Sequence, residues 1–261
     1  MSPLLLLSVA LAVAAPAFLV LFVLARRIRN FGIVDIAWAG GFAPVAIFYA
    51  VAGRGDLLHR LLIASLVTAW SLRLALHLGV RVLGHHPVED GRYVQLRREW
   101  ADHLGLKMGA FFVFQAVLLV GLSTPFALTV DAVQSGFSGW DAAALLVGFV
   151  AVAGEALADA QLSAFKRDPV NRGRVCATGL WGWSRHPNYF FEWLVWIAFA
   201  LAAVPVPHGW LAWACPVLMG YFLTRVTGIR YTEEQLLRSK GAAYRTYQQR
   251  TSAFIPWPPR R

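Results

Sequence analysis

The stretch Gly179–Trp193, GLWGWSRHPNYFFEW, joins a basic, aromatic loop to an apolar segment that still carries a carboxylate. Pro187 suits the first turn of a helix, and the helix N-terminus that it predicts offers free N–H groups and a positive dipole end to an anion. Asn188 and Glu192 lie four residues apart and therefore share one face of that helix. Because an ionisable group within a bilayer is costly, Glu192 indicates a functional site; the structural alternative is a satisfied carboxylate beside a juxtamembrane basic cluster.

The composition of the whole chain predicts a membrane protein. Of its 261 residues, 58% are hydrophobic, 11 are Trp and only 15% are charged, which departs strongly from a soluble domain. Apolar runs that are long enough to cross a bilayer recur along the chain. The sequence therefore predicts an all-α, polytopic integral membrane protein that forms one domain over residues 1–261 and contacts membrane lipids.

Basic residues set the orientation of the apolar segments. Of the 24 Lys and Arg residues, 21 lie in or beside the connections after the first, third, fifth and seventh segments, and 2 lie beside the connection after the second. Because positively charged connections stay in the cytoplasm, we expect the N-terminus outside and the C-terminus in the cytoplasm. The seven expected transmembrane helices are Leu4–Ala25, Phe31–Ala52, Leu57–Val80, Met108–Val130, Trp140–Phe165, Tyr189–Val206 and Trp210–Thr227.

Local signals add detail to this topology. A short helix is expected in the polar connection 81–107, and a Ser-Thr-Pro kink is expected at 123–125. The Gly40-Gly41 pair predicts a close approach between helices. The tail 228–261 alternates basic residues with Tyr and Leu at helical spacing, which predicts an amphipathic helix on the cytosolic surface.

Several classes of function are excluded at this level. The net charge of +10 would suit nucleic acid in a soluble protein, but the basic residues lie in short connections and form no motif or continuous face. No nucleic-acid partner is therefore expected. Cys176 and Cys215 fall in different environments without metal-ligand spacing, so neither a metal site nor a disulfide is expected.

Charged residues within the expected spans form patterns of their own. Asp35 is the only carboxylate of the second span, near its inner end, where it could act as an acid or only pair with Arg29 at the membrane edge. The third and fifth spans, each taken with the residue directly after it, place three ionisable residues on one helix face, with opposite signs predominating. These two sets could complement each other around a site or form a plain salt-bridge network. The sets are Arg73, His77 and Arg81, and Glu155, Asp159 and Lys166.

All these candidates lie at the cytoplasmic ends of the expected spans, which predicts a polar cavity open to the cytosol. A transporter would more often hold ionised groups near the midplane between two related halves, and the sequence shows neither feature. A large, multiply charged cosubstrate fits better, because Arg binds phosphates while Asn and carboxylates bind amide or ribose groups. Arg174 and Arg230 join the candidates on this reasoning.

The motifs carry a resemblance to a known family. WGWSRHPNYFFEW resembles the motif of the membrane sterol and steroid reductases, in which RHPNY is followed by a carboxylate. From FGIVDIAWAGGF through DAQLSAFKRDPVNRGRV to YQQRTSAFIPWPP, the chain looks like the bacterial uncharacterised branch of the steroid 5-alpha-reductase superfamily. The resemblance implies seven helices, a cytosolic NADPH site, hydride transfer to a carbon–carbon double bond of a lipid-soluble substrate, and a location in the bacterial inner membrane.

Site roles follow from the resemblance position by position. Asn188 and Glu192 match the residues that hold the nicotinamide-ribose end. The steroid enzymes use a Tyr and a Glu at the substrate carbonyl; Trp70 stands at the Tyr position and Asp35 is the nearest counterpart of the acid, which gives the two candidate catalytic residues. Trp offers only a weakly acidic N–H. The candidate cofactor-binding residues are Arg73, His77, Arg81, Glu155, Asp159, Lys166, Arg174, Asn188, Glu192 and Arg230.

We therefore expect an NADPH-dependent oxidoreductase that acts on a CH–CH group of a steroid-like or isoprenoid lipid, with Asp35 as the acid. A second hypothesis is an S-adenosylmethionine-dependent membrane methyltransferase of the isoprenylcysteine or phospholipid type, because RHP-x-Y followed by R-x-x-E-E (Arg230, Glu233, Glu234) resembles that class. Asn188 and Glu192 are not required by the methyltransferase pattern. A lipid-binding scaffold would leave the inner carboxylates unexplained.

Overall fold

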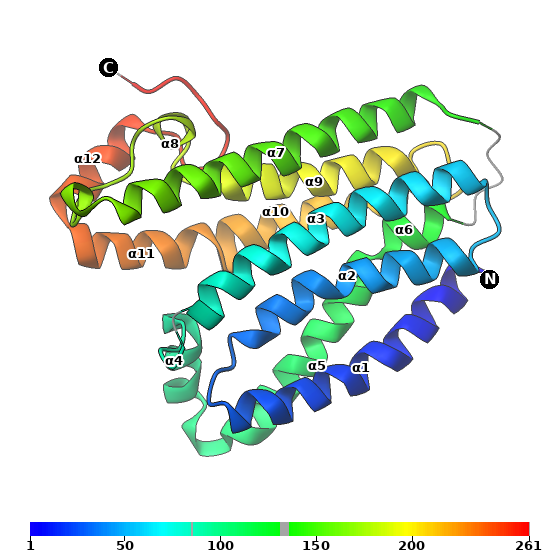
Figure 1. Cartoon of the computed structure of the whole chain (residues 1–261), viewed down its shortest axis with the longest axis horizontal. Helices are drawn as coiled ribbons and strands as arrows, with labels where there is room; N and C mark the ends of the chain where they lie inside the picture. The colour runs from blue at the N-terminus through cyan, green and yellow to red at the C-terminus, as the bar shows by residue number, and fades with distance from the viewer. Residues whose placement is uncertain (85, 131–135, 261) are drawn as a thin grey trace. The chain divides into compact units, whose positions relative to one another are not determined.

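The computed structural model describes residues 1–84, 86–130 and 136–260, and its regular structure is helical (Figure 1). Within those residues, extended backbone pairs only at an isolated parallel bridge between Ser184 and Ser252. The prediction of an all-α chain is therefore confirmed. His85, in the expected connection 81–107, and Arg261, in the expected tail, lie outside the described residues.

Five of the described helical stretches are long and apolar enough to cross a membrane, which is consistent with an integral membrane protein. They correspond to the first five expected spans. The expected sixth span is α9 (Pro187–Ala203), which has only 17 residues, and the expected seventh is divided among several short helices, so the count of seven stays a prediction. The five are α1 (Pro3–Arg27), α2 (Ile33–Ala52), α3 (Leu57–Gly84), the stretch Ala101–Thr129, and α7 (Gly139–Arg167).

The chain divides into two compact units. The first comprises Met1–Ser138 and Ala203–Leu211, and the second comprises Gly139–Ala202 and Ala212–Arg261. The single domain expected over residues 1–261 stays a prediction. Besides α1, α2 and α3, the first unit contains α4 (Gly91–Glu99), η1 (Ala101–His103), α5 (Leu104–Leu122) and α6 (Thr124–Thr129).

Small and hydroxyl residues bring the helices of the first unit together. The Ser71 hydroxyl of α3 donates to the Ala39 carbonyl of α2 at 2.6 Å and accepts from the Ala43 N–H at 3.1 Å, so it bridges one turn of α2. A Cβ at Gly41 would lie 2.4 Å from Leu119 of α5. The close helix approach predicted from the Gly40-Gly41 pair is thus present.

The predicted kink is also present, as a break between two helices. α5 ends at Leu122, and α6 begins at Thr124 with Pro125 in its first turn, where a missing N–H costs no hydrogen bond. The Ser123 side chain at the break bonds to the Tyr49 hydroxyl of α2 at 2.9 Å. Tyr49 and Ser123 are both fully buried, so this bond ties the break to the core of the unit.

The second unit is built on α7 and α9, which run side by side (Figure 1). A Cβ at Gly154 of α7 would lie 2.4 Å from the Phe191 ring of α9, so only Gly allows this approach. The Trp193 indole N–H of α9 donates to the Pro216 carbonyl of α10 at 2.9 Å. The remaining elements of this unit are η2 (Pro169–Asn171), α8 (Leu180–Trp183), α10 (Ala214–Tyr221), the π-helical turn η4 (Phe222–Val226), α11 (Ile229–Lys240) and α12 (Ala242–Arg250). The turn η3 (Gly209–Trp213) begins in the first unit and ends in the second.

The tail differs from the single amphipathic helix that was expected. It forms two helices that separate at Gly241, whose φ of 54° lies in the left-handed region that Gly adopts without strain. Tyr244 and Tyr247 of α12 are buried, with exposures of 1% and 7%, and the Tyr247 hydroxyl donates to the Trp181 carbonyl. Both Tyr side chains therefore pack inside the unit.

Candidate functional site

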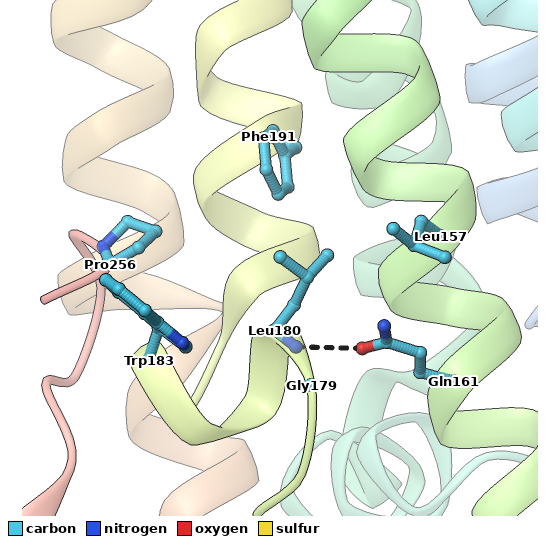
Figure 2. Close-up of a pocket in the computed structure, with 7 residues that line it drawn as sticks. All are labelled: Leu157, Gln161, Gly179, Leu180, Trp183, Phe191 and Pro256. Atoms are coloured by element: carbon cyan, nitrogen blue, oxygen red, sulfur yellow. Dashed lines mark hydrogen bonds between the residues drawn. The ribbon is translucent and has the colours of Figure 1, made fainter. Parts of the chain in front are cut away.

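The segment before α9 is fixed to α7 by polar contacts with the backbone. Gly179 has a φ of 58°, and a Cβ there would lie 2.7 Å from the Gln161 side chain. Gln161 Oε1 accepts the Leu180 N–H at 2.9 Å (Figure 2), and the Trp181 indole N–H donates to the Ala158 carbonyl at 2.9 Å. The GLWGW sequence therefore forms α8 directly against α7.

A carboxylate of α11 organises the residues that precede α9. Arg185 Nε donates to Glu233 Oε1 at 2.6 Å, and His186 Nε2 lies 3.3 Å from the same oxygen. The Tyr244 hydroxyl donates to Oε1 at 3.3 Å, and Gln248 Nε2 donates to Oε2 at 2.8 Å. We call these five residues the Glu233 cluster. It joins the RHP-x-Y segment to the R-x-x-E-E segment, which lie 47 residues apart at His186 and Glu233.

The chain after α12 completes the surroundings of Arg185. Arg185 Nη1 donates to the Gln248 and Thr251 carbonyls, and the backbone N–H of Arg185 donates to the Ser252 carbonyl at 2.8 Å. Further along, the Ser184 hydroxyl donates to the Phe254 carbonyl at 2.8 Å. Thr251–Phe254 is therefore a strap across the start of α9, and the Arg185 side chain is only 11% exposed beneath it.

Protonation follows from these contacts. Burial alone would raise the pKa of Glu233, but hydrogen bonds from His186 and Arg185 outweigh it and lower the pKa to about 2. Burial lowers the pKa of His186, although Glu233 opposes the shift. Because an ionised carboxylate only accepts hydrogen bonds, a neutral His186 carries its proton on Nε2. His186 is also stacked on Tyr189, with ring centroids 5.4 Å apart, so its ring orientation is fixed.

The lowered pKa of Glu233 predicts a loss of stability in acid. A carboxyl group with a depressed folded-state pKa stabilises the fold fully above its ordinary value of 4.5 and loses that contribution as the pH falls towards about 2. Thermal midpoints measured between these pH values should fall for the parent protein and fall less for Glu233→Gln. Glu234→Gln, at a half-exposed neighbour, should keep the parental pH dependence. Parallel curves for Glu233→Gln and the parent would contradict the prediction.

Further polar residues lie within α7 and α9. Asn188 Nδ2 donates to Asp159 Oδ1 at 3.3 Å, so the structure brings together two residues that the sequence placed in one site. The Trp196 indole N–H donates to Glu192 Oε1 at 3.1 Å, one turn along α9. The acidic residues of this helix pair are all buried and are Asp141, Glu155, Asp159 and Glu192, with exposures of 4%, 3%, 8% and 6%. Such burial of ionisable groups requires hydrogen-bonding partners.

The basic candidates of the second unit lie at its surface. Lys166 is at the end of α7, and Arg174 is in the following loop; both are exposed. Arg230 pairs with Glu234 at 3.3 Å in an exposed i, i+4 contact, with side-chain exposures of 70% and 45%. Glu234 therefore pairs within its own helix, whereas Glu233 contacts residues that are distant in the sequence.

In the first unit, Asp35 lies in a network with α4. The Tyr93 hydroxyl donates to Oδ1 at 2.6 Å, Arg92 Nη2 donates to Oδ2 at 2.8 Å, and Arg81 Nη2 lies 3.9 Å from Oδ2. Asp90 caps α4 through the Arg92 N–H and pairs with the Arg92 side chain at 3.2 Å. We call these residues the Asp35 network. Burial is the main cause that raises the pKa of Tyr93, and the neighbouring Asp35 carboxylate raises it further. The Tyr93 hydroxyl therefore stays protonated.

A second contact pair supports the same network. Glu89 accepts the Phe31 N–H at 2.6 Å and pairs with Arg97 at 2.6 Å, and the Arg97 guanidinium lies 4.2 Å from the Phe31 ring centroid. The sequence placed a short helix in this connection, and α4 confirms it. The sequence alone gave no role to Arg92 or Glu89. Asp90, which lies directly before a basic helix, is a capping signal that could have directed attention to them.

The other candidates of the first unit all lie on α3. Trp70 is fully buried and packs on Phe42, with ring centroids 5.2 Å apart. Arg73 and His77 lie one and two turns beyond Trp70, and Arg81 reaches the Asp35 network. The candidate residues thus divide between the two units: Asp35, Trp70, Arg73, His77 and Arg81 in the first, and Glu155, Asp159, Lys166, Arg174, Asn188, Glu192 and Arg230 in the second.

Comparison with known proteins gives the chain a family. The profile described as "Protein of unknown function (DUF1295)" matches residues 21–251, which include the Asp35 network and the Glu233 cluster. The chain belongs to the DUF1295 family. An uncharacterized protein of Schizosaccharomyces pombe is 28% identical over 249 residues, covering 87% of this DUF1295 chain and 71% of the yeast protein. No solved structure matches.

Proposed function

We propose that this protein is an NADPH-dependent membrane reductase that transfers hydride to a carbon–carbon double bond of a steroid-like or isoprenoid lipid. The observation that carries the proposal is the Asn188–Asp159 contact, flanked on α7 and α9 by buried Glu155 and Glu192. An amide beside carboxylates offers the donors and acceptors that a carboxamide and ribose hydroxyls require.

The surface residues of the second unit fit the anionic part of the same cofactor. Lys166 lies two turns beyond Asp159 on α7, and Arg174 lies in the loop after it, where both are accessible to phosphates. Bound NADPH would supply the hydride. The chain's own residues would bind and orient it in a site open to the cytosol, with Arg230 as a further proposed contact in this unit. Arg73, His77 and Arg81, the other predicted cofactor-binding residues, lie in the first unit.

We assign the proton-supplying role to the Asp35 network of the first unit. Asp35 accepts hydrogen bonds from both Tyr93 and Arg92, so its carboxylate is held as an acceptor. Tyr93 is the protonated member of the pair, and Asp35 orients its hydroxyl. Trp70, the other proposed catalytic residue, supplies a buried aromatic surface on the same unit.

Ligand-dependent thermal stability tests the cofactor. NADPH in excess should raise the unfolding temperature of the detergent-purified protein, because a ligand that binds only the folded state stabilises it. Glu192→Gln and Arg174→Ala should each weaken NADPH binding by about 1 to 3 kcal/mol, the range for a lost charge-assisted hydrogen bond. Arg172→Ala, at an exposed Arg two residues from Arg174, is the matched control and should bind as the parent does. No stabilisation of the parent by NADPH or NADH would refute the reductase.

The Glu233 cluster favours a second candidate function. It joins Arg185 and His186 of RHP-x-Y to Glu233 of R-x-x-E-E, the two segments whose combination resembles integral-membrane methyltransferases. In that case the cosubstrate would be S-adenosylmethionine, and the buried carboxylates would suit its positive charge. Thermal stabilisation by S-adenosylmethionine but not by NADPH would select this function.

The proposed enzyme has seven spans, with α9 and the α10 region as the sixth and seventh, and lies in a bacterial inner membrane with its C-terminus in the cytoplasm. The split of basic residues between the connections supports this orientation. A reporter fused after Arg261 should therefore be active in the cytoplasm. A membrane-impermeant thiol reagent should label Arg54→Cys and His208→Cys from outside, in a Cys176→Ser, Cys215→Ser background. Labelling of Arg54→Cys only after the membrane is opened would contradict this topology.

A further inference from the structure

A cavity of about 330 Å³ opens on the second unit beside α7 (Figure 2). Its walls come from four parts of the unit: α7, α8, α9 and the chain after α12. The volume lies at the lower end of the range of roughly 300 to 1,000 Å³ that is typical of small-ligand sites. The lining residues are Leu157, Gln161, Gly179, Leu180, Trp183, Phe191 and Pro256.

The walls of the cavity suit an apolar occupant. Phe191 lies directly on Gly154, so its ring closes the space between α7 and α9. Gln161 is the only lining residue with a polar side chain apart from the Trp183 indole, and its Oε1 already accepts the Leu180 N–H. A buried water requires two to four polar partners, and this lining offers few, so hydrocarbon fills the cavity better than water does.

The mouth of the cavity continues the exposed apolar face of α7. Leu157 and Trp183 at the mouth are 51% and 50% exposed. Leu146 and Val150 lie on the same face of α7 as Leu157, eleven and seven residues earlier, and are 66% and 46% exposed. Because α7 is long and apolar enough to cross a membrane, we expect this face to contact lipid chains.

The depth of the cavity also fits a lipid. Leu157 lies ten residues before Arg167, the basic end of α7, which is about 15 Å along the helix and so within the chain region of one leaflet. Trp183 and Trp257 are both exposed near the cavity, as Trp side chains are at membrane–water boundaries. A phospholipid with its headgroup level with Lys166 and Arg167 would direct its chain towards Leu157.

We propose that this cavity binds one acyl chain of a membrane phospholipid. The site differs from a position on the face of α7 alone, because Leu180, Phe191 and Pro256 from three other segments also line it. It requires neither cofactor nor substrate and stands independently of the proposed reductase.

Photo-crosslinking tests the site in nanodiscs that contain a phosphatidylcholine with a diazirine in its acyl chain. Trypsin releases the peptide 175–185, which carries Leu180 and Trp183 of the cavity wall. We expect this peptide to be labelled in the parent protein, and Leu157→Trp, which fills the mouth, to reduce the labelling several-fold. Leu146→Trp, the same substitution on the same lipid-exposed face, should leave it unchanged.

Two results would overturn the proposal. One is equal labelling of peptide 175–185 in Leu157→Trp and Leu146→Trp, and the other is no labelling of this peptide in the parent while Leu146 and Phe149 are labelled by annular lipid. Leu157→Ala, which enlarges the cavity, tests whether misfolding could account for the reduced labelling in Leu157→Trp. It should retain the labelling that Leu157→Trp loses.

Discussion

Replacing Arg185 by Ala should lower the free energy of unfolding by about 3 to 5 kcal/mol, the range for removing one partner of a buried ion pair. The Arg185 side chain is 11% exposed and donates to Glu233 and to two carbonyls of the chain after helix α11. Its loss leaves the Glu233 carboxylate without its guanidinium donor and the Gln248 and Thr251 carbonyls without theirs. Denaturant titration of the purified protein in detergent, followed by Trp fluorescence, measures the effect.

Arg230→Ala is the matched control for this change. Arg230 contacts Glu234 on the same helix that carries Glu233, but the pair is exposed, so its loss should cost no more than about 0.5 kcal/mol. Arg185→Lys keeps the charge but not the planar set of donors, and it should fall between the two. Similar unfolding energies for Arg185→Ala and Arg230→Ala would show that the Glu233 cluster contributes little to stability.

Asp35→Asn should lower the free energy of unfolding by about 2 to 4 kcal/mol, because it weakens a charge-assisted bond from Arg92 and leaves Asp90 as the one carboxylate that this partly buried cation contacts in the network. If Asp35 also orients Tyr93 for catalysis, turnover of the lipid should be lost while NADPH still binds with near-parental affinity. Thermal melting and NADPH titration on the same samples separate these two effects.

Two further variants identify the part that Asp35 plays. Tyr93→Phe keeps the ring and the Arg92 pair and removes only the hydroxyl that Asp35 accepts at 2.6 Å. It should reproduce the loss of turnover with a smaller loss of stability. Asp102→Asn, at an exposed Asp near the same connection, should change neither. Full turnover in Tyr93→Phe would assign Asp35 a structural role only.

The helical architecture could be predicted from sequence because its signals are local. Apolar runs give the spans, and Ser123-Thr124-Pro125 gives the break between α5 and α6 through the missing N–H of Pro125. The tail shows the limit of such signals. The helical spacing is confirmed, but Gly241 divides the tail into two helices, and Tyr244 and Tyr247 are buried, with the Tyr247 hydroxyl donating to the Trp181 carbonyl of α8.

The clusters could be predicted only in part, because their contacts join distant segments. Periodicity places Arg230, Glu233 and Glu234 together, but it cannot show that Glu233 pairs with Arg185, 48 residues away. Likewise, Asp35 was singled out as a charge in an apolar span, whereas its partner Arg92 is 57 residues further along. Asn188 and Asp159 were assigned to one site through the family resemblance, and their contact spans 29 residues.

The strap over Arg185 has a consequence for biosynthesis. A ribosome makes α9 before the strap, and the Thr251 carbonyl that Arg185 binds follows 66 residues later. During that interval, the Arg185 guanidinium and the Ser184 hydroxyl lack their carbonyl partners in the strap. Formation of α9 and burial of the residues that precede it are therefore separate events in time, and the second depends on contacts of high sequence separation, which form slowly.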